Sequence, residues 1–283
     1  MKLLRYGAPG SEKPGLLDGD GNIRDLSGIV PDIGGAWLDD NNLDRIRTAD
    51  IAVLPLVDKR QRIGTCVTTP VNFIAVGLNY ADHAAESGMP IPSEPILFSK
   101  APNCIVGPSD DVIIPPASSG LDWEIELAFV IGKRAWNVEE SNAMQHIAGF
   151  CICNDVSERS WQLEGTGQWL KGKSAPTFGP LGPWLVTGDE IGDIGNLKME
   201  LKVDGKTMQS GSTKTMIFGV SFLVSYISRF MELLPGDVIT TGTPPGVGMG
   251  MKPPIFLKPG NVMELAIEGL GEQRQLVRLP CPA

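Results

Sequence analysis

Histidine and cysteine are scarce in this sequence of 283 residues, and their scarcity excludes several kinds of site. The two histidines, His83 and His146, are too few for a three-histidine zinc site. The five cysteines are odd in number and show no framework spacing, so no disulfide scaffold is predicted. Cys151 and Cys153 lie in an apolar run and are interpreted as small buried strand residues. This cysteine usage favours a reducing, cytoplasmic compartment.

Long apolar runs and clusters of basic residues are also missing. No apolar stretch approaches the roughly 20 residues that span a bilayer, and the opening MKLLRYGAPG has too short an apolar run for a signal peptide. We therefore expect no membrane partner. The chain has 24 Lys and Arg against 33 Asp and Glu, a net charge of −9, which disfavours a nucleic-acid partner. A small anionic substrate would need cations gathered locally.

The composition is typical of a soluble globular protein, with 42% hydrophobic and 20% charged residues. The length allows a main domain and a smaller one. Residues 1–66 are predicted to form a small N-terminal domain, with a hairpin around DGDG at 18–21 and a short helix after it. That motif lacks the distal glutamate of a calcium loop, so a tight turn is predicted. Residues 67–283 would form the main domain.

The main domain is predicted to have a β-rich α+β fold. From Val71 onward short apolar runs are separated by Gly and Pro. They do not alternate regularly with long helices, which disfavours a doubly wound sheet or a TIM barrel. Two helices are predicted, over 138–148 and 221–234. The predicted strands cover 72–78, 123–131, 147–154, 183–187, 197–204, 237–241 and 262–268.

The segment GLDWEIELAFVIGK, residues 120–133, combines a strand pattern with two acidic residues. Side chains alternate between the faces of a strand, so Glu124 and Glu126 point to the same side. The opposite face is wholly apolar and is predicted to enter the core. Adjacent like charges repel each other unless a cation or solvent separates them. The acidic face is therefore either solvated or part of an enclosed polar cleft.

A third acidic residue follows the next predicted strand, in FCICNDVSER. With Asp155 at the strand end, three carboxylates become available, and few histidines accompany them. Oxygen donors of this kind suit a hard divalent cation, Mg²⁺ or Mn²⁺. Spacing alone does not decide between such a metal site and a solvated strand face.

A histidine and a glutamate share one face of a predicted short helix in GLNYADHAAESG, residues 77–88. His83 and Glu86 are three positions apart, so they become neighbours in a helix. A carboxylate beside an imidazole orients the ring and raises its basicity, as in a general base that activates water. Taken alone, an ordinary surface pair is the better interpretation.

Two Gly/Pro-rich segments contain further polar candidates. Lys171 and Lys173 lie in QWLKGKSAPTFGPLGP, where a lysine near a carboxylate centre could stabilise an enolate. The segment TTGTPPGVGMGMKPP, residues 240–254, offers Thr243 and backbone N–H groups as a carboxylate cradle. Its Gly246-Val247-Gly248 is only a weak dinucleotide-binding signal, because no helix follows. The nearest match to a serine-hydrolase elbow, at 219–223, lacks the second glycine.

Together these motifs resemble the fumarylacetoacetate hydrolase superfamily. The resemblance covers the chain from about residue 72 to its end, and the first 66 residues look like the short N-terminal domain of bacterial members. The nearest subgroup contains 2,4-diketo-3-deoxy-sugar-acid hydrolases, and many of its members carry the label ureidoglycolate lyase. The motifs that carry the resemblance are GLNYADHAAESG, PILFSKAPNCIVGPSDDVIIPP, LDWEIELAFVIGK, GFCICNDVSER, KGKSAPTFGPLGPW and TTGTPPGVGMG.

The resemblance implies a homodimer whose main domain is a mixed β-sheet roll, and it implies roles for individual residues. Glu124, Glu126 and Asp155 would hold Mg²⁺ or Mn²⁺. The catalytic group would consist of the His83–Glu86 dyad, on a mobile lid helix, and Lys173. The residues that bind substrate oxygens would be Arg159, Gln162 and Thr243. Lys100 matches a position near the pocket, without an assigned role.

The hypothesis for the reaction is metal-dependent hydrolysis of a C–C bond in a 2,4-dioxo acid, giving pyruvate and a second acid. The substrate could be an acylpyruvate or a 2,4-diketo-3-deoxy sugar acid. The same site would also allow a 2-oxo-acid decarboxylase, an isomerase or a ureidoglycolate lyase. A non-catalytic metal-binding module is a further alternative. Residues 89–94 and 160–169 are expected to shape the pocket for the variable part of the substrate.

Overall fold

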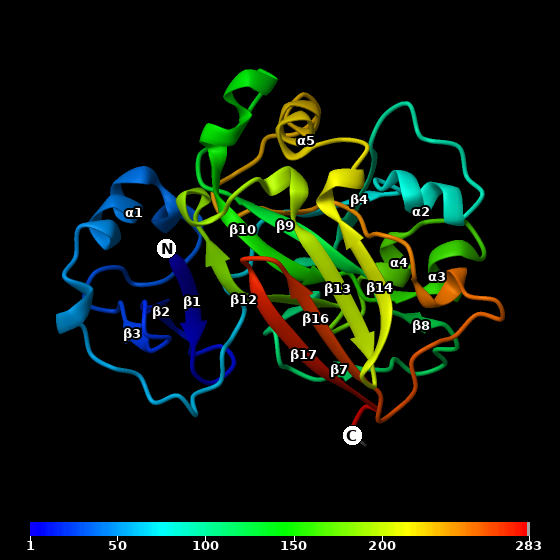
Figure 1. The fold of residues 1–283 in the computed structure, drawn as a ribbon, viewed down its shortest axis with the longest axis horizontal. Coiled ribbons are helices and arrows are strands. Elements are labelled where there is room, and N and C mark those ends of the chain that lie inside the picture. Colours follow the sequence, from blue (N-terminus) through cyan, green and yellow to red (C-terminus); the bar gives the residue numbers. More distant parts are fainter. Residues whose placement is uncertain (282–283) are drawn as a thin grey trace.

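The structure, a computed structural model, describes residues 1–281 and contains two large mixed sheets with short helices at their edges (Figure 1). The larger sheet has ten strands in the order β3-β2-β1-β12-β10-β9-β15-β4-β5, with β6 added beside β12. Its strands are β1 (Lys2–Tyr6), β2 (Lys13–Leu17), β3 (Ile23–Asp25), β4 (Phe73–Gly77), β5 (Ile96–Lys100), β6 (Ile105–Val106), β9 (Ile125–Ile131), β10 (Ile147–Asn154), β12 (Gly179–Val186) and β15 (Val238–Thr240).

The second sheet has five strands in the order β14-β13-β16-β17-β7, and a two-stranded sheet pairs β11 with β8. These strands are β7 (Val112–Ile113), β8 (Leu121–Asp122), β11 (Ser157–Glu158), β13 (Lys198–Val203), β14 (Lys206–Ser212), β16 (Val262–Ile267) and β17 (Gly271–Arg278). The α-helices are α1 (Asp40–Arg47), α2 (Ala81–Glu86), α3 (Arg159–Leu163), α4 (Leu170–Lys173) and α5 (Val220–Ile227). The β-rich α+β prediction is confirmed.

The core lies where the second sheet covers the middle of the first. Every residue of β9 is buried, and β10 is buried from its second residue onward. Strands covered on both faces need apolar side chains on both, which explains their nearly continuous apolar runs. Figure 1 shows β16 and β17 crossing over this region, and the Gln273 side-chain amide of β17 donates to the Ile152 carbonyl of β10 at 2.8 Å.

The structure corrects both predicted helices. The 138–148 segment forms a 3₁₀ helix over Glu140–His146 only, because Ile147 already pairs with Ile131 in the central sheet. The 221–234 segment is helical only to Ile227. Beyond that point Leu233 exchanges two backbone hydrogen bonds of 2.9 Å with Ala135, so tertiary pairing ends the helix early.

The sequence pattern did not predict several of the strands, among them β1, β5, β14 and β17. In β17 the buried positions include Gln273 and Gln275, which are at most 2% exposed. Their amides satisfy carbonyl groups inside the protein rather than pack as hydrophobic side chains. Alternation of apolar and polar residues therefore does not mark this strand.

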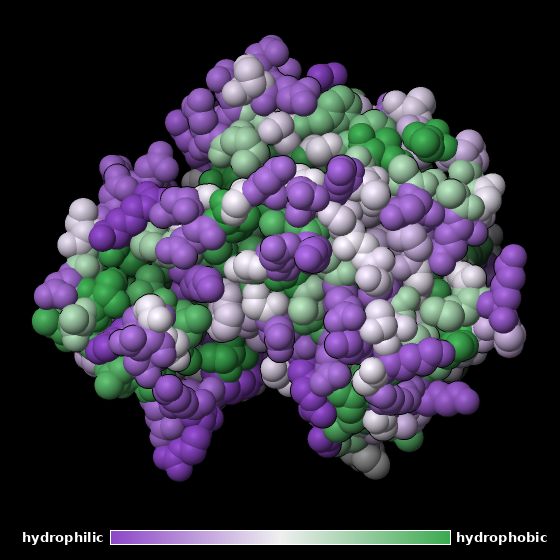
Figure 2. All heavy atoms as spheres, viewed as in Figure 1, coloured by the Kyte–Doolittle hydropathy of each residue, from purple (hydrophilic) through white to green (hydrophobic). Residues whose placement is uncertain are grey.

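The N-terminal strands extend the central sheet. Lys2 and Leu3 pair with Val186 and Leu185 of β12, and Leu3 and Leu16 belong to the main hydrophobic core. The turn at 18–21 is tight, since Asp18 accepts hydrogen bonds from the amides of Asp20 and Asn22. A domain boundary near residue 66 stays a prediction, and the sheet itself runs from β3 to β5 without a break. The face shown in Figure 2 is mostly hydrophilic and hollowed beside the N-terminal strands.

Candidate metal centre and active site

Three carboxylates from two neighbouring strands meet in the centre of the main domain. Glu126 lies in β9, Glu124 directly precedes that strand, and Asp155 directly follows β10. Because β9 and β10 are antiparallel, the start of β9 lies opposite the end of β10. There the Asp155 amide donates to the Glu124 carbonyl at 2.9 Å. One oxygen from each carboxylate lies within 4.8 Å of the others. The side chains share one side of the strand as predicted, although β9 begins at Ile125 rather than at 123.

The carboxylate cluster is enclosed. Glu124, Glu126 and Asp155 are 7%, 2% and 0% exposed, which excludes an open, solvated strand face. The cluster forms the charged end of a cavity of about 560 Å³. Of the remaining candidates, the cavity lining includes His83, Glu86, Arg159, Gln162, Lys173 and Thr243. All nine residues singled out from the sequence are therefore brought to one place.

Buried cations neutralise two of the three carboxylates. The Lys173 ammonium, at the end of α4, lies 2.8 Å from Glu124 Oε2 and 2.6 Å from Asp155 Oδ2. Arg159 Nη1 lies 2.7 Å from Glu124 Oε1. Burial would raise the pKa of Glu124, but Lys173 and Arg159 outweigh that effect and hold its pKa well below the usual range.

Glu126 differs, since it forms no ion pair with any of residues 1–281. Its Oε2 accepts a hydrogen bond of 2.9 Å from the Gly242 amide. Burial, followed by repulsion from Asp155 and Glu124, raises the pKa of Glu126 well above the usual range. The cluster is therefore deficient in positive charge at this carboxylate.

The residues fit a hard divalent cation. The donor set consists of carboxylate oxygens alone, which Mg²⁺ and Mn²⁺ prefer. A divalent cation beside Glu126 would compensate the negative charge that the buried lysines and Arg159 do not balance. Such a site would be held by Glu124, Glu126 and Asp155, with remaining positions open to water or substrate.

Metal binding is expected to be linked to pH through Glu126. Because the metal-free fold holds the Glu126 proton more tightly than the unfolded chain does, this group's contribution to stability falls as pH rises above the usual carboxyl pKa of 4.5. Mg²⁺ competes with that proton, so the Mg²⁺-induced rise in melting temperature should be larger at pH 8 than at pH 5.5. Thermal unfolding with EDTA and with excess Mg²⁺ measures both values. Equal increments at the two pH values would contradict the linkage.

The predicted dyad is present on α2. His83 Nδ1 lies 3.1 Å from a Glu86 carboxylate oxygen, and Glu86 also accepts from the Gly246 amide at 3.1 Å. The helix is tied to the body of the protein, since Thr215 donates to Asp82 at 3.1 Å. The turn before it is held by buried Asn79, whose side chain bonds to Thr241 and Phe218. Both dyad side chains face the cavity, which favours a site over a surface pair.

The Gly-rich segment after β15 does bind carboxylates, but they are the protein's own. Gly246 donates to Glu86, while the Gly248 and Met249 amides donate to Asp122 at 2.7 and 3.0 Å. These N–H groups are therefore occupied, and the predicted substrate cradle is wrong for them. They instead fix Asp122, which lies 2.8 Å from Arg159 Nε.

The predicted substrate-binding residues differ in whether their polar atoms already have hydrogen-bond partners among residues 1–281. Arg159 Nη1 contacts Gln162 Oε1 at 2.9 Å, whereas its Nη2 is buried without a hydrogen-bond partner among residues 1–281. A buried guanidinium N–H of this kind is a strong donor for a carboxylate. The Thr243 hydroxyl donates to the Ile125 carbonyl and accepts from the Gln209 amide, both at 2.8 Å. Its role toward substrate stays a prediction.

The sequence assigns no role to Lys100, which the structure buries beneath the cluster. Its ammonium is fully buried, lies 2.6 Å from Asp155 Oδ1 and donates to the Lys173 carbonyl. Burial would lower the pKa of Lys100, but Asp155 raises it above the usual range, so the residue is a permanent cation. A lysine ending an apolar run is ordinarily solvated, and only the three-dimensional structure identifies its burial.

Replacing Lys100 with methionine is expected to lower the free energy of unfolding by less than the roughly 3–5 kcal/mol that an unpaired buried charge costs, because Asp155 would lose one of its two buried cations and keep Lys173. Urea unfolding in EDTA measures this change. Lys171→Met is the matched control, since Lys171 is exposed two residues before Lys173. A loss of stability no larger than that of the control would show that Lys100 does not support the cluster.

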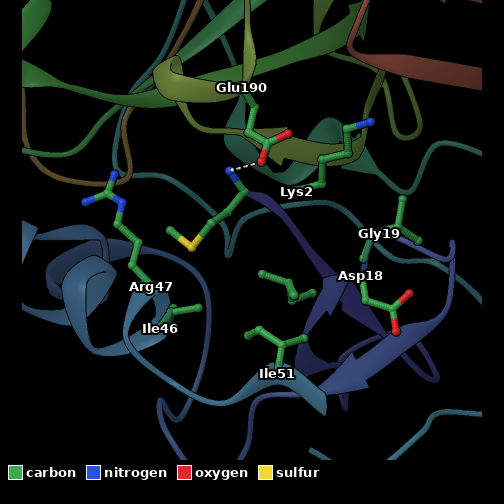
Figure 3. Close-up of a pocket in the computed structure, with 10 residues that line it drawn as sticks. Lys2, Asp18, Gly19, Ile46, Arg47, Ile51 and Glu190 are labelled. Carbon is green, nitrogen blue, oxygen red and sulfur yellow. Dashed lines mark ion pairs between the residues drawn. The ribbon is translucent and has the colours of Figure 1, made fainter.

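A second cavity, of about 390 Å³, lies between the N-terminal strands and the end of β12 (Figure 3). The N-terminal ammonium faces Glu190 across it at 3.3 Å, and Arg47 and Lys2 lie on its rim. Asp18, also on the rim, is paired with Arg24 at 2.8 Å. The pair of Met1 with Glu190 joins the start of the first strand to the segment after β12, whereas the pair of Asp18 with Arg24 lies within the β2–β3 hairpin. The residues that line this cavity include none of the predicted site residues.

Comparisons with known proteins relate most of this chain to one family. Residues 72–278 match the family model described as fumarylacetoacetate (FAA) hydrolase C-terminal. A Burkholderia multivorans protein, provisionally named a hydrolase, is 58% identical over 98% of this chain and 99% of its own length. None of the helices within residues 1–281 combines the length and hydrophobicity needed to cross a membrane.

Two solved structures extend the comparison. The fumarylacetoacetate hydrolase of Exiguobacterium antarcticum is 36% identical, with a TM-score of 0.85 over 99% of this chain and 100% of that chain. The maleylpyruvate hydrolase of Sphingobium sp. SYK-6, in complex with manganese(II) and pyruvate, is 26% identical, with a TM-score of 0.81 over 99% of both chains. The second structure shows a relative of this chain that binds a divalent metal and a 2-oxo acid.

Proposed function

Since this chain belongs to the fumarylacetoacetate hydrolase family, we propose that it is a divalent-metal-dependent hydrolase of 2,4-dioxo acids. The reaction would add water across the bond between C3 and C4, giving pyruvate and the acid derived from the acyl group. The observation that carries the proposal is the enclosed cavity in which a carboxylate cluster, a free buried guanidinium N–H and a histidine–glutamate dyad meet.

The charged end of the cavity suits the 2-oxo acid part of the substrate. A metal ion bound by the three carboxylates would act as a Lewis acid on the substrate's oxygens. Arg159 Nη2 would donate to the substrate carboxylate, and Gln162 beside it would hold the guanidinium in place. The Sphingobium relative, solved with manganese(II) and pyruvate, supports a divalent metal and a 2-oxo acid as the ligands of this site.

The dyad would supply the base. His83, oriented by Glu86, would remove a proton from water as its oxygen attacks C4. Breaking the C3–C4 bond leaves the electron pair on C3 as pyruvate enolate, which takes up a proton to give pyruvate. The Lys173 ammonium, which already balances buried negative charge, would stabilise this developing anion.

The proposal is tested by assaying purified, Mg²⁺-loaded protein for pyruvate release from acetylpyruvate and longer acylpyruvates. We expect equimolar pyruvate and acyl acid, and loss of both when EDTA removes the metal. Carbon dioxide as the product would indicate decarboxylation, and an isomerised 2-oxo acid would indicate the isomerase alternative. Absence of any product from 2-oxo acids or ureidoglycolate, despite tight metal binding, would favour a binding module.

The metal identity and the assembly are part of the proposal. Carboxylate ligands do not discriminate strongly between Mg²⁺ and Mn²⁺, so activity with both is expected. The homodimer and the cytoplasmic location implied by the resemblance and by the cysteine usage also stay predictions. Sedimentation of the metal-loaded protein measures its assembly directly.

A further inference from the structure

The side of the cavity beyond Lys173 is an aromatic wall. The Lys173 ammonium lies 5.4 Å from the centre of the Phe98 ring, and this ring meets the Trp169 indole edge to face at 5.3 Å. The wall therefore begins beside the charged cluster and runs outward. Other apolar side chains in the same cavity are Val76, Leu78, Met89, Leu163 and Met249.

The Trp169 indole packs tightly against the backbone in this wall. It lies against Gly77, where an added Cβ would come 2.4 Å from the indole Cζ3. Gly77 is the last residue of β4, and the glycine is needed there for the close approach of the ring. Any larger side chain at this position would force the indole to shift.

Polar groups in the cavity are concentrated elsewhere. The carboxylates lie with Lys173 and Arg159, and the dyad occupies α2. The remaining polar side chains of the lining are Ser87, Gln162, Thr243 and Lys252. A substrate chain with several hydroxyl groups would leave them without partners along the aromatic wall, at a cost in affinity. An apolar chain would instead remove its own surface and that of the wall from water.

We propose that Phe98 and Trp169 select the acyl group of the substrate and favour an apolar alkyl or phenyl group over a polyhydroxylated chain. This inference rests on the proposed function and narrows its substrate class to apolar acylpyruvates. It argues against the 2,4-diketo-3-deoxy sugar acids that the sequence resemblance leaves open. Trp169 would be a specificity-determining residue, remote from the bond that breaks.

The test compares benzoylpyruvate, acetylpyruvate and a 2,4-diketo-3-deoxy sugar acid as substrates of the Mg²⁺-loaded protein. Single methylenes in tight pockets change kcat/KM by about 10–200-fold, so benzoylpyruvate should exceed the sugar acid by at least about tenfold. Trp169→Ala should lower the ratio of benzoylpyruvate to acetylpyruvate kcat/KM by at least about tenfold, mainly through KM. Gly77→Ala should change the ratio in the same direction. Trp136→Ala, at a tryptophan 55% exposed and outside the cavity, is the control.

A binding measurement separates this inference from the proposed reaction. Calorimetry on the Mg²⁺-loaded protein gives the affinities of 4-phenyl-2-oxobutanoate and 2-oxobutanoate without turnover. Preference for the phenyl compound that Trp169→Ala removes would support the inference, even if no 2,4-dioxo acid were hydrolysed and the proposed reaction failed. Hydrolysis without any preference for apolar acyl groups would overturn the inference and leave the reaction standing. A preference unchanged in Trp169→Ala would overturn it as well.

Discussion

Replacing Glu126 with glutamine should abolish turnover and weaken Mg²⁺ binding while leaving the metal-free protein at least as stable as the wild type. The carboxylate is buried, lies beside Asp155 and Glu124, and forms no ion pair in the described part of the chain. Removing its charge therefore relieves repulsion in the metal-free fold. Glutamine keeps the side-chain shape and an oxygen that can accept from Gly242. Opposite effects on metal binding and on metal-free stability distinguish a ligand from a merely structural residue.

The expected losses are large. A bound divalent ion contributes several kcal/mol of transition-state stabilisation, and each 1.36 kcal/mol is a factor of ten in rate, so kcat/KM should fall by at least about 10³-fold. Mg²⁺ affinity should fall by more than the roughly 10- to 100-fold that the loss of an outer-shell partner costs. Steady-state assays, calorimetry with Mg²⁺ and urea unfolding in EDTA measure the three quantities.

Glu164→Gln is the matched control, because Glu164 is exposed and directly follows α3. It should bind Mg²⁺ and turn over substrate as the wild type does. If Glu126→Gln bound Mg²⁺ with wild-type affinity, Glu126 would not be a ligand. If the metal-free variant were strongly destabilised, the charge imbalance inferred at Glu126 would be wrong.

Replacing His83 with alanine should lower kcat by about 10²–10⁴-fold, the range expected for loss of a general base, with Mg²⁺ affinity unchanged. The imidazole faces the cavity from α2 and contacts Glu86, but it lies outside the carboxylate cluster. Truncation there should leave the cluster and its cations in place. Steady-state kinetics at saturating substrate and calorimetry with Mg²⁺ check both parts.

The chain provides its own control in His146, the other histidine. Its ring contacts backbone carbonyls of Lys133 and Arg134 at the end of the 3₁₀ helix, outside the cavity. His146→Ala should keep wild-type kcat. Normal turnover by His83→Ala would remove the dyad from the mechanism and favour a reaction in which no water is activated. Loss of Mg²⁺ binding in the same variant would assign His83 to the metal site instead.

Most of the β-rich architecture could be read from the chain because its central strands are covered on both faces. β9 and β10 carry nearly continuous apolar runs that no solvated strand would have. The strands that escaped prediction, such as β17, turn buried glutamines inward. The two predicted helices were too long, because pairing of Ile147 and Leu233 with distant residues overrides local helix preference.

The order of residues alone shows which donor groups are available. Two histidines are too few for a three-histidine zinc site, while three carboxylates around two strands and a His-x-x-Glu pair offer ligands for a hard cation and an imidazole base. Spacing alone left a solvated strand face and an ordinary surface pair as alternatives. Alternation along β9 also placed Glu124 and Glu126 on one side, because strand side chains have a period of two.

Three-dimensional packing determines how those charges are balanced and what surrounds them. The pairing of Lys100 with Asp155, the repulsion of Glu126 by Asp155 and the contact of Trp169 with Gly77 each join segments far apart in the chain. Such contacts depend on strand register and loop packing, which leave no periodic signal in the sequence. The same long-range packing directs the amides of Gly248 and Gly246 in the glycine-rich loop to Asp122 and Glu86.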